Sequence, residues 1–197
     1  MLRSIEQLNG IHVLVAKCFI DERGFLLQSY MRSDLTARGI HAEFRQAIQS
    51  KSRRGAVRGM HFQFEPPQGK LVRCVSGRIF DVVVDLRHGS PTQRDHGVVE
   101  LSGRNHKVIW IPPGFAHGFM AVEDDSVVLY ECTAEWSPAG EWGILWNDSA
   151  LGIDWPPLSA IVSQKDRVNP TLAEWLADPR SSIFSVVEKT KQAEKMK

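Results

Sequence analysis

The 197-residue sequence predicts an all-β fold, a jelly roll of two packed sheets with a few short peripheral helices. Two observations support this prediction. Most of the chain consists of short apolar or alternating runs separated by Gly, Pro, Asp and Ser, and the clearest run, Ile79 to Arg87, has a period of two. In that run Asp81, Val83, Asp85 and Arg87 alternate with Phe80, Val82, Val84 and Leu86, so one face is apolar and the other is charged.

Ten segments have the character of strands, which suits a two-sheet jelly roll. In chain order they are residues 12–19, 25–30, 43–50, 56–62, 70–76, 79–87, 98–102, 107–111, 118–122 and 127–133. Helix signals are few. Ser33 can cap a short turn that ends at Gly39, and Asn169-Pro170 opens a segment with Leu172, Trp175 and Leu176 on one face. We therefore expect the helices to be peripheral.

The length of the chain suits one substantial core, and 43% of its residues are hydrophobic. We find no internal repeat and no low-complexity linker, so we expect a single domain over residues 1–197. Residues 170–197 are expected to form its C-terminal helical extension or tail. Within them, residues 188–197 are mostly Lys, Glu and Gln, which suits either a solvated helix or a frayed tail with no assigned function.

The charge balance excludes broad classes of partner. Lys and Arg total 24 against 23 for Asp and Glu, so we expect neither nucleic acid nor an anionic membrane as a partner. The first ten residues lack the apolar core of a secretory signal, and no later run is long enough to span a bilayer. Three widely spaced cysteines without a CxxC pair suggest buried, reduced thiols. We expect a cytoplasmic protein.

Three strand-like segments carry cations and imidazoles that a packed core does not need. They contain Arg58 and His61, then Lys70, and then Pro112 to His117. A site that binds an anion and moves protons explains them better than packing does. Strict alternation would place Arg58 and His61 on opposite faces of their strand, so we expect the strand to bend at Gly59.

Metal chemistry is the weaker interpretation of this site. Metal-binding jelly rolls use a His-x-His pair, whereas this chain has His61-Phe62-Gln63, and only His61 and His117 remain as ligands. We therefore expect no metal. A histidine with an ordinary pKa of about 6.5 suits proton transfer when a carboxylate orients its ring. Spacing alone does not choose among Asp81, Asp85 and Asp166 as that partner, nor between this role and a core histidine bonded to a backbone carbonyl.

Tyr130 lies on a strand where alternation points it away from Leu129 and Glu131. A buried phenol at this position can donate a proton, and the alternative is an ordinary core aromatic residue.

Several ordered blocks resemble one known family. RGMHFQ, KLVRCVSGRIFDVVVDLR, SPT, IPPGFAHGF, LYECT, WNDSALGIDWP and SQKD together are similar to the dTDP-4-dehydrorhamnose 3,5-epimerase family, from about residue 21 to residue 166. The resemblance implies a cupin-type jelly roll, a double-stranded β-helix, in a homodimer whose N-terminal strands cross to the partner. It implies a nucleotide-diphosphate sugar as substrate, no cofactor, and a role in deoxysugar biosynthesis.

The same resemblance implies roles for individual residues. His61 would be the base that removes a proton next to a C4 ketone, with Asp166 as its orienting carboxylate, and Tyr130 the acid on the opposite face. Lys70 would stabilise the C4 enolate. The substrate contacts that the resemblance implies come from Arg58, His117, Arg23, Gln28, Gln46, Gln63 and Asp81.

Departures from the family pattern leave the substrate open. Gln28 stands where the family has an acidic residue, and Ile48 stands where it has an asparagine, which changes the hydrogen-bonding capacity at positions that resemble nucleotide contacts. Residues 90–95 and Glu135-Trp136 also differ and can reshape the rim of the pocket. We therefore keep CDP or GDP beside dTDP, and inversion of C3, C5 or both. A metal-dependent cupin oxygenase or isomerase and a non-catalytic sugar-binding barrel are the alternatives from other classes.

Overall fold

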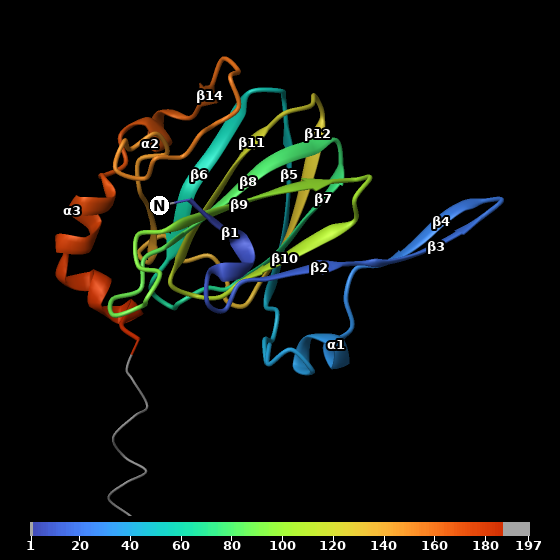
Figure 1. Ribbon diagram of the computed structural model, residues 1–197, viewed down its shortest axis with the longest axis horizontal. Coiled ribbons are helices and arrows are strands. Elements are labelled where there is room, and N and C mark those ends of the chain that lie inside the picture. Colours follow the sequence, from blue (N-terminus) through green and yellow to red (C-terminus); the bar gives the residue numbers. More distant parts are fainter. Residues whose placement is uncertain (1, 187–197) are drawn as a thin grey trace, which may run out of the picture.

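Two β-sheets face each other across an apolar interior, so the all-β jelly-roll prediction is confirmed (Figure 1). The computed structural model describes residues 2–186. The first sheet has the order β1 (Leu2–Ser4), β9 (His96–Ser102), β8 (Arg78–Asp85), β11 (Phe115–Ala121), β6 (Ala56–Gln63) and β13 (Glu141–Gly143), and β14 (Ile161–Val162) also pairs with β6. The second sheet has the order β2 (His12–Val15), β10 (Lys107–Ile111), β7 (Lys70–Ser76), β12 (Ser126–Cys132) and β5 (Gln46–Ser52).

A two-stranded hairpin, β3 (Lys17–Asp21) and β4 (Gly24–Gln28), extends away from the barrel (Figure 1). The single strand expected over residues 12–19 is therefore wrong. The chain leaves the second sheet at Ala16, whose backbone N–H donates to the carbonyl of His106 at 2.9 Å, and the following residues pair only with β4. The hairpin carries exposed apolar side chains: Ile20 is 83% exposed and Leu26 is 71% exposed.

The other strand predictions are close to the structure, and two of them, β7 and β10, have the expected bounds. Strands β1, β13 and β14 were not predicted, because two or three residues are too few to show alternation. All three cysteine thiols are free; Cys74 and Cys132 are buried, whereas Cys18 is only half-buried.

The helices are short and peripheral, as expected. α1 (Arg32–Thr36) begins after Met31, which makes no side-chain cap, so the prediction of a Ser33 cap is wrong. α3 (Leu172–Ala177) is capped by Thr171 in a capping box with Glu174. The structure also contains α2 (Gln164–Arg167) and the 3-10 helix η1 (Ile5–Gln7), which sequence analysis did not predict, and the 3-10 helix η2 (Pro179–Phe184), which lies within the expected C-terminal extension.

The C-terminal segment explains why both faces of β8 are buried. Trp175 and Phe184, from α3 and η2, pack with Val82 and Val84 on the outer face of the first sheet. The predicted extension from residue 170 therefore covers this sheet as far as Phe184, and the expected solvated or frayed segment 188–197 lies outside the described residues. Since the outer face is apolar, the charged face of β8 points into the barrel. Within residues 2–186, the helices are all too short and polar to cross a bilayer.

Candidate active site

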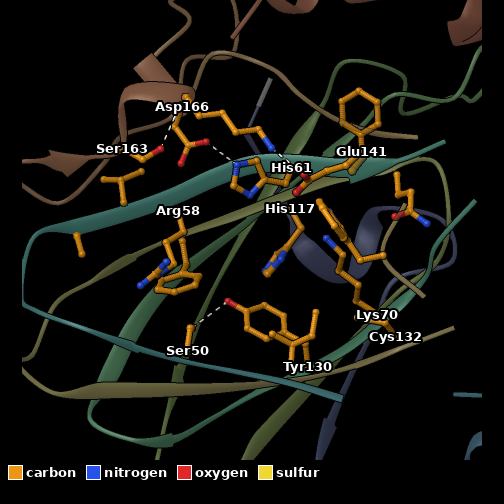
Figure 2. Close-up of a pocket in the computed structure, with 18 of the residues that line it drawn as sticks. Ser50, Arg58, His61, Lys70, His117, Tyr130, Cys132, Glu141, Ser163 and Asp166 are labelled. Atoms are coloured by element: carbon orange, nitrogen blue, oxygen red, sulfur yellow. Dashed lines mark hydrogen bonds and ion pairs between the residues drawn. The ribbon is translucent and has the colours of Figure 1, made fainter. Parts of the chain in front are cut away.

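The space between the two sheets contains a cavity of about 550 Å³ that collects the residues singled out in the sequence (Figure 2). Its walls come from β5, β6, β7, β11, β12, β13, β14 and the short helix α2. Those of the predicted residues that line it are Arg58, His61, Gln63, Lys70, His117, Tyr130 and Asp166. The three strand-like segments that sequence analysis grouped into one site therefore meet in one cavity.

A bulge in β6 allows Arg58 and His61 to face the same cavity. His61 lies opposite His117 on β11 and Arg58 lies opposite Phe119, so between these pairs two residues of β6 oppose one residue of β11. Gly59 lies in this bulge with a φ of +130°, and a Cβ there would come within 2.6 Å of the Cα of Gly118. The bend expected at Gly59 is confirmed, and only glycine fits it.

His61 is paired with Asp166. The Nε2 atom of His61 lies 2.6 Å from Oδ1 of Asp166, which comes from α2. Helix α2 begins at Ser163, whose Oγ accepts from the backbone N–H of Asp166 at 3.1 Å, and the N–H of Gly59 reaches the second carboxylate oxygen at 3.5 Å. Burial opposes ionisation of Asp166, but the hydrogen bond from His61 and these further contacts lower its pKa. Asp166 is therefore an anion at neutral pH.

A second pair, His117 and Asp81, lies deeper in the barrel. His117 Nε2 is 2.7 Å from Oδ2 of Asp81, and both side chains are almost fully buried. Burial raises the pKa of Asp81, although His117 and Lys70 act against it. Oδ1 of Asp81 has no hydrogen-bond partner among the described residues. Asp85, the third carboxylate considered as a partner of His61, instead accepts hydrogen bonds from Arg87, Ser90 and Thr92.

Tyr130 and Lys70 lie across the cavity from His61 (Figure 2). Burial raises the pKa of the Tyr130 phenol, which keeps it protonated at neutral pH and able to donate. Its hydroxyl lies 3.5 Å from Oγ of Ser50. Burial lowers the pKa of Lys70, and nearby acidic groups, including Glu141 and Asp81, partly offset this effect. An anion formed in the cavity would favour the ammonium form of Lys70.

The remaining predicted substrate contacts have other partners in this structure. The amide of Gln63 donates to the carbonyls of Pro66 and Glu135 and accepts from the N–H of Ser137, so it fixes the loop beside the cavity. Gln46 accepts from the backbone N–H of Trp136 at 2.8 Å. Arg23 and Gln28 lie on the projecting hairpin and do not line the cavity of their own chain.

Two charged residues of the cavity were not singled out from the sequence. Glu141 on β13 and Lys165 on α2 line the cavity and form an ion pair of 2.7 Å beside His61. Burial opposes ionisation of Glu141, but Lys165, Trp136 and His61 lower its pKa. Lys165 could have been found because it precedes Asp166 in the SQKD block. Glu141 follows a turn at Gly140 and lies on a strand of three residues, which leaves no sequence pattern.

The fold and the cavity define a class of protein: a cupin-type jelly roll whose interior holds an imidazole–carboxylate pair, a protonated phenol and the amine of Lys70. Such a set can remove a proton from one face of a bound molecule and supply one from the other.

Comparison with known proteins identifies the family. The family model for dTDP-4-dehydrorhamnose 3,5-epimerase matches residues 6–174. The chain is 45% identical over 168 residues to the dTDP-4-dehydrorhamnose 3,5-epimerase of Salmonella typhimurium, covering 83% of this chain and 91% of that protein. The chain therefore belongs to the dTDP-4-dehydrorhamnose 3,5-epimerase family.

Two solved structures of similar proteins carry ligands. The dTDP-6-deoxy-D-glucose-3,5-epimerase of Legionella pneumophila, in complex with dTDP-4-keto-L-rhamnose, superposes with a TM-score of 0.86 at 36% identity, covering 92% of this chain and 96% of that one. ChmJ, a 3′-monoepimerase of Streptomyces bikiniensis in complex with dTDP-quinovose, superposes with a TM-score of 0.83 at 27% identity, covering 93% of each chain. Similar folds thus occur in enzymes described as acting at two centres and at one.

Proposed function

We propose that this protein epimerises a nucleotide-diphosphate 4-keto-6-deoxyhexose, with dTDP as the nucleotide, at C3, C5 or both. The observation that supports this most is the placement of the His61–Asp166 pair and Tyr130 in one cavity without direct contact between them. An inversion needs a base on one face of a carbon and an acid on the other, with room for the sugar between. The names of the relatives and the ligands in their structures support the substrate class.

The proposed reaction follows from the charges in the cavity. The C4 ketone acidifies the C–H bonds at C3 and C5, and His61 takes the proton from one of them. The electron pair of that bond moves to the C4 oxygen, where the Lys70 ammonium stabilises the enolate more than it stabilises the ketone. Tyr130 then donates its proton to the opposite face of the carbon, which restores the ketone with inverted configuration. Asp166, an anion, holds the His61 ring and stabilises the imidazolium.

Deuterium exchange tests the proposal directly. The purified protein is incubated in D₂O with dTDP-4-keto-6-deoxyglucose, and deuterium at C3 and C5 is followed by NMR. We expect incorporation and inversion with the unmodified protein and neither with His61→Asn. Exchange that survives His61→Asn would refute the role of His61, and an unmodified protein without exchange would refute the function.

Quaternary structure is part of the proposal. We propose a homodimer in which the β3–β4 hairpin crosses to the partner and brings Arg23 and Gln28 to the partner's cavity. Apolar side chains of the hairpin are exposed in the single chain; Phe19 is 56% exposed and Phe25 is 64% exposed. This exposure supports a hairpin surface that the partner covers in the assembly. Scattering and ultracentrifugation should give the mass of a dimer, and a variant lacking residues 17–28 should lose affinity for substrate. A monomeric mass for the unmodified protein at assay concentration would exclude this arrangement.

The nucleotide is tested separately. Ile48 lines the cavity and is 40% exposed, and its side chain offers no hydrogen bond to a base, so CDP and GDP remain alternatives to dTDP. A thermal-shift panel of dTDP, CDP, GDP and UDP should show the largest increase in melting temperature for the cognate nucleotide. A larger shift with CDP or GDP than with dTDP would move the assignment to that nucleotide.

A further inference from the structure

The two proton-transfer groups of the cavity differ in their hydrogen-bond partners. His61 has a side chain that is 27% exposed and a carboxylate partner, so its proton can exchange with water. The ring of Tyr130 packs against the core between the sheets, and Ser50 is the only described side chain that hydrogen-bonds its hydroxyl. The contact between the Tyr130 hydroxyl and Ser50 Oγ spans 3.5 Å (Figure 2).

We propose that Ser50 is the residue that returns the proton to Tyr130 after each inversion. This inference rests on the proposed function, because it concerns how the same site is reset. Ser50 acts through Tyr130 and does not touch the reacting carbon.

Each inversion leaves a proton imbalance between the two groups. His61 has gained the proton from carbon and Tyr130 has lost its own, so the product leaves behind an imidazolium and a phenolate. The imidazolium loses its proton to water directly. The phenolate lies where burial disfavours its charge, so it must receive a proton before the next turnover.

The pairing of β5 with β12 places Ser50 where it can supply that proton. Tyr130 lies opposite Ile48 in the ladder, and Ser50 follows Ile48 by two residues, on the same face of β5. Ser50 is half-buried, while its neighbours Ile48 and Lys51 are exposed. The serine hydroxyl therefore lies beside the phenol, on a strand whose neighbouring side chains are exposed.

The next hydroxyl on this face of β5 has a different partner. Ser52 Oγ accepts from Nε of Arg58 at 3.0 Å, so it is committed to holding a guanidinium group. Ser50 has no such competitor among its described contacts, and its hydroxyl is free to rotate between Tyr130 and water.

The step balances without a further reactant. The O–H bond of Ser50 breaks as its proton passes to the Tyr130 phenolate, and a new Ser50 O–H bond forms with a proton from water or from a buffer acid. Ser50 ends the step unchanged, and the net result is transfer of one proton from solvent to Tyr130.

Single-turnover and multiple-turnover rates separate this role from a structural one. With enzyme in excess, Tyr130 starts protonated, so Ser50→Ala should invert the substrate at a rate within about twofold of the unmodified protein. With substrate in excess, the steady-state rate should fall about tenfold, a smaller loss than the ~10²–10⁴-fold contribution of a direct acid or base. Ser50→Thr, which keeps the hydroxyl, should restore the steady-state rate.

Ser76→Ala is the matched control, since Ser76 is an exposed serine at the end of the neighbouring strand β7. It should leave both rates unchanged. Equal losses of both rates in Ser50→Ala would mean that Ser50 only supports the structure, and no loss in either would mean that Tyr130 is recharged by another route. Either result would contradict the proposal that Ser50 returns the proton to Tyr130. If the unmodified protein exchanges deuterium and His61→Asn does not, the proposed function stands even when the proposed role of Ser50 is refuted.

Discussion

The barrel contains two histidine–aspartate pairs that have nearly the same nitrogen–oxygen distance but different surroundings. His61 lies 2.6 Å from Asp166 and His117 lies 2.7 Å from Asp81. Asp166 also accepts from the N–H of Gly59, and the side chain of His61 is partly exposed. Asp81 accepts only from His117 among its described contacts, and both members of that pair are buried.

The difference shows that a short contact does not by itself define a catalytic base. At Asp166 the hydrogen bonds outweigh the effect of burial and keep the carboxylate anionic, so it can stabilise a proton that His61 acquires. Burial acts in the same direction on Asp81, but there the hydrogen bond from His117 and the charge of Lys70 do not outweigh it, so the pKa of Asp81 is raised. The first pair suits proton abstraction. The second pair suits a fixed hydrogen-bonding position in the cavity. It lies beside Tyr130, whose ring centroid is 6.1 Å from that of His117.

Replacing each histidine with asparagine should give the largest difference in activity between the two pairs. We expect His61→Asn to lower kcat about 10³-fold, within the range of a lost general base. His117→Asn should cost about tenfold, mainly in KM, because it removes a hydrogen-bonding surface but leaves the base in place. Steady-state kinetics with deuterium exchange measures both. Losses of equal size would mean that both pairs transfer protons.

Lys70 links the second pair to the chemistry, since its ammonium group partly offsets the effect of burial on Asp81. Lys70→Met should lower kcat about 10²-fold by removing enolate stabilisation. It should leave the melting temperature unchanged or higher, because burial disfavours the charged ammonium. Thermal unfolding and kinetics on the same preparation test this. A variant that loses stability as well as activity would show that Lys70 also supports the fold.

The two aspartates should change the pH dependence of stability in opposite directions. The folded pKa of Asp166 is lowered, so its contribution is present above the unfolded value and lost as pH falls through the folded value. The folded pKa of Asp81 is raised, so its contribution is complete below the unfolded value and lost as pH rises through the folded value. In urea unfolding from pH 3 to 7, Asp166→Asn should cost about 1–2 kcal/mol, mainly at the neutral end.

Asp81→Asn is the matched variant, and it should cost least at the neutral end, where the native carboxyl group is most penalised by burial. Parallel stability curves for Asp166→Asn and Asp81→Asn would contradict the difference between the two pairs.

The sequence allowed the fold and part of this site to be predicted, for reasons that individual residues make clear. The bulge at Gly59 was predictable because Arg58 and His61 cannot share a face of a regular strand. The partner of His61 was not predictable from spacing, since Asp166 lies 105 residues away and Asp81 and Asp85 are nearer in the chain. Only the family resemblance pointed to Asp166, and the structure pairs the two residues.

Other features depend on contacts that leave no local pattern. The apolar face of β8 is covered from outside by the distant segment with Trp175 and Phe184, so its charged face points into the barrel. Glu141 reaches the cavity through a strand of three residues that pairs with the end of β6. Neither arrangement has a periodic signal in the sequence, because both are set by residues far apart in the chain.

The smallest expected effect concerns the ion pair beside His61. Lys165 is half exposed, so its contribution to Glu141 is screened and modest. Lys165→Met removes the ammonium group. The pKa of Glu141 should then rise, because less positive charge opposes the effect of burial on its carboxylate. Glu141 would then take up a proton at a higher pH. The acid limb of the kcat/KM profile should move upward in pH, while activity near pH 8 stays within about threefold.

Lys165→Arg keeps the charge and should keep the profile of the unmodified protein. If the acid limb does not move in Lys165→Met, protonation of Glu141 does not limit the reaction, and the acid side of the profile belongs to the His61–Asp166 pair alone.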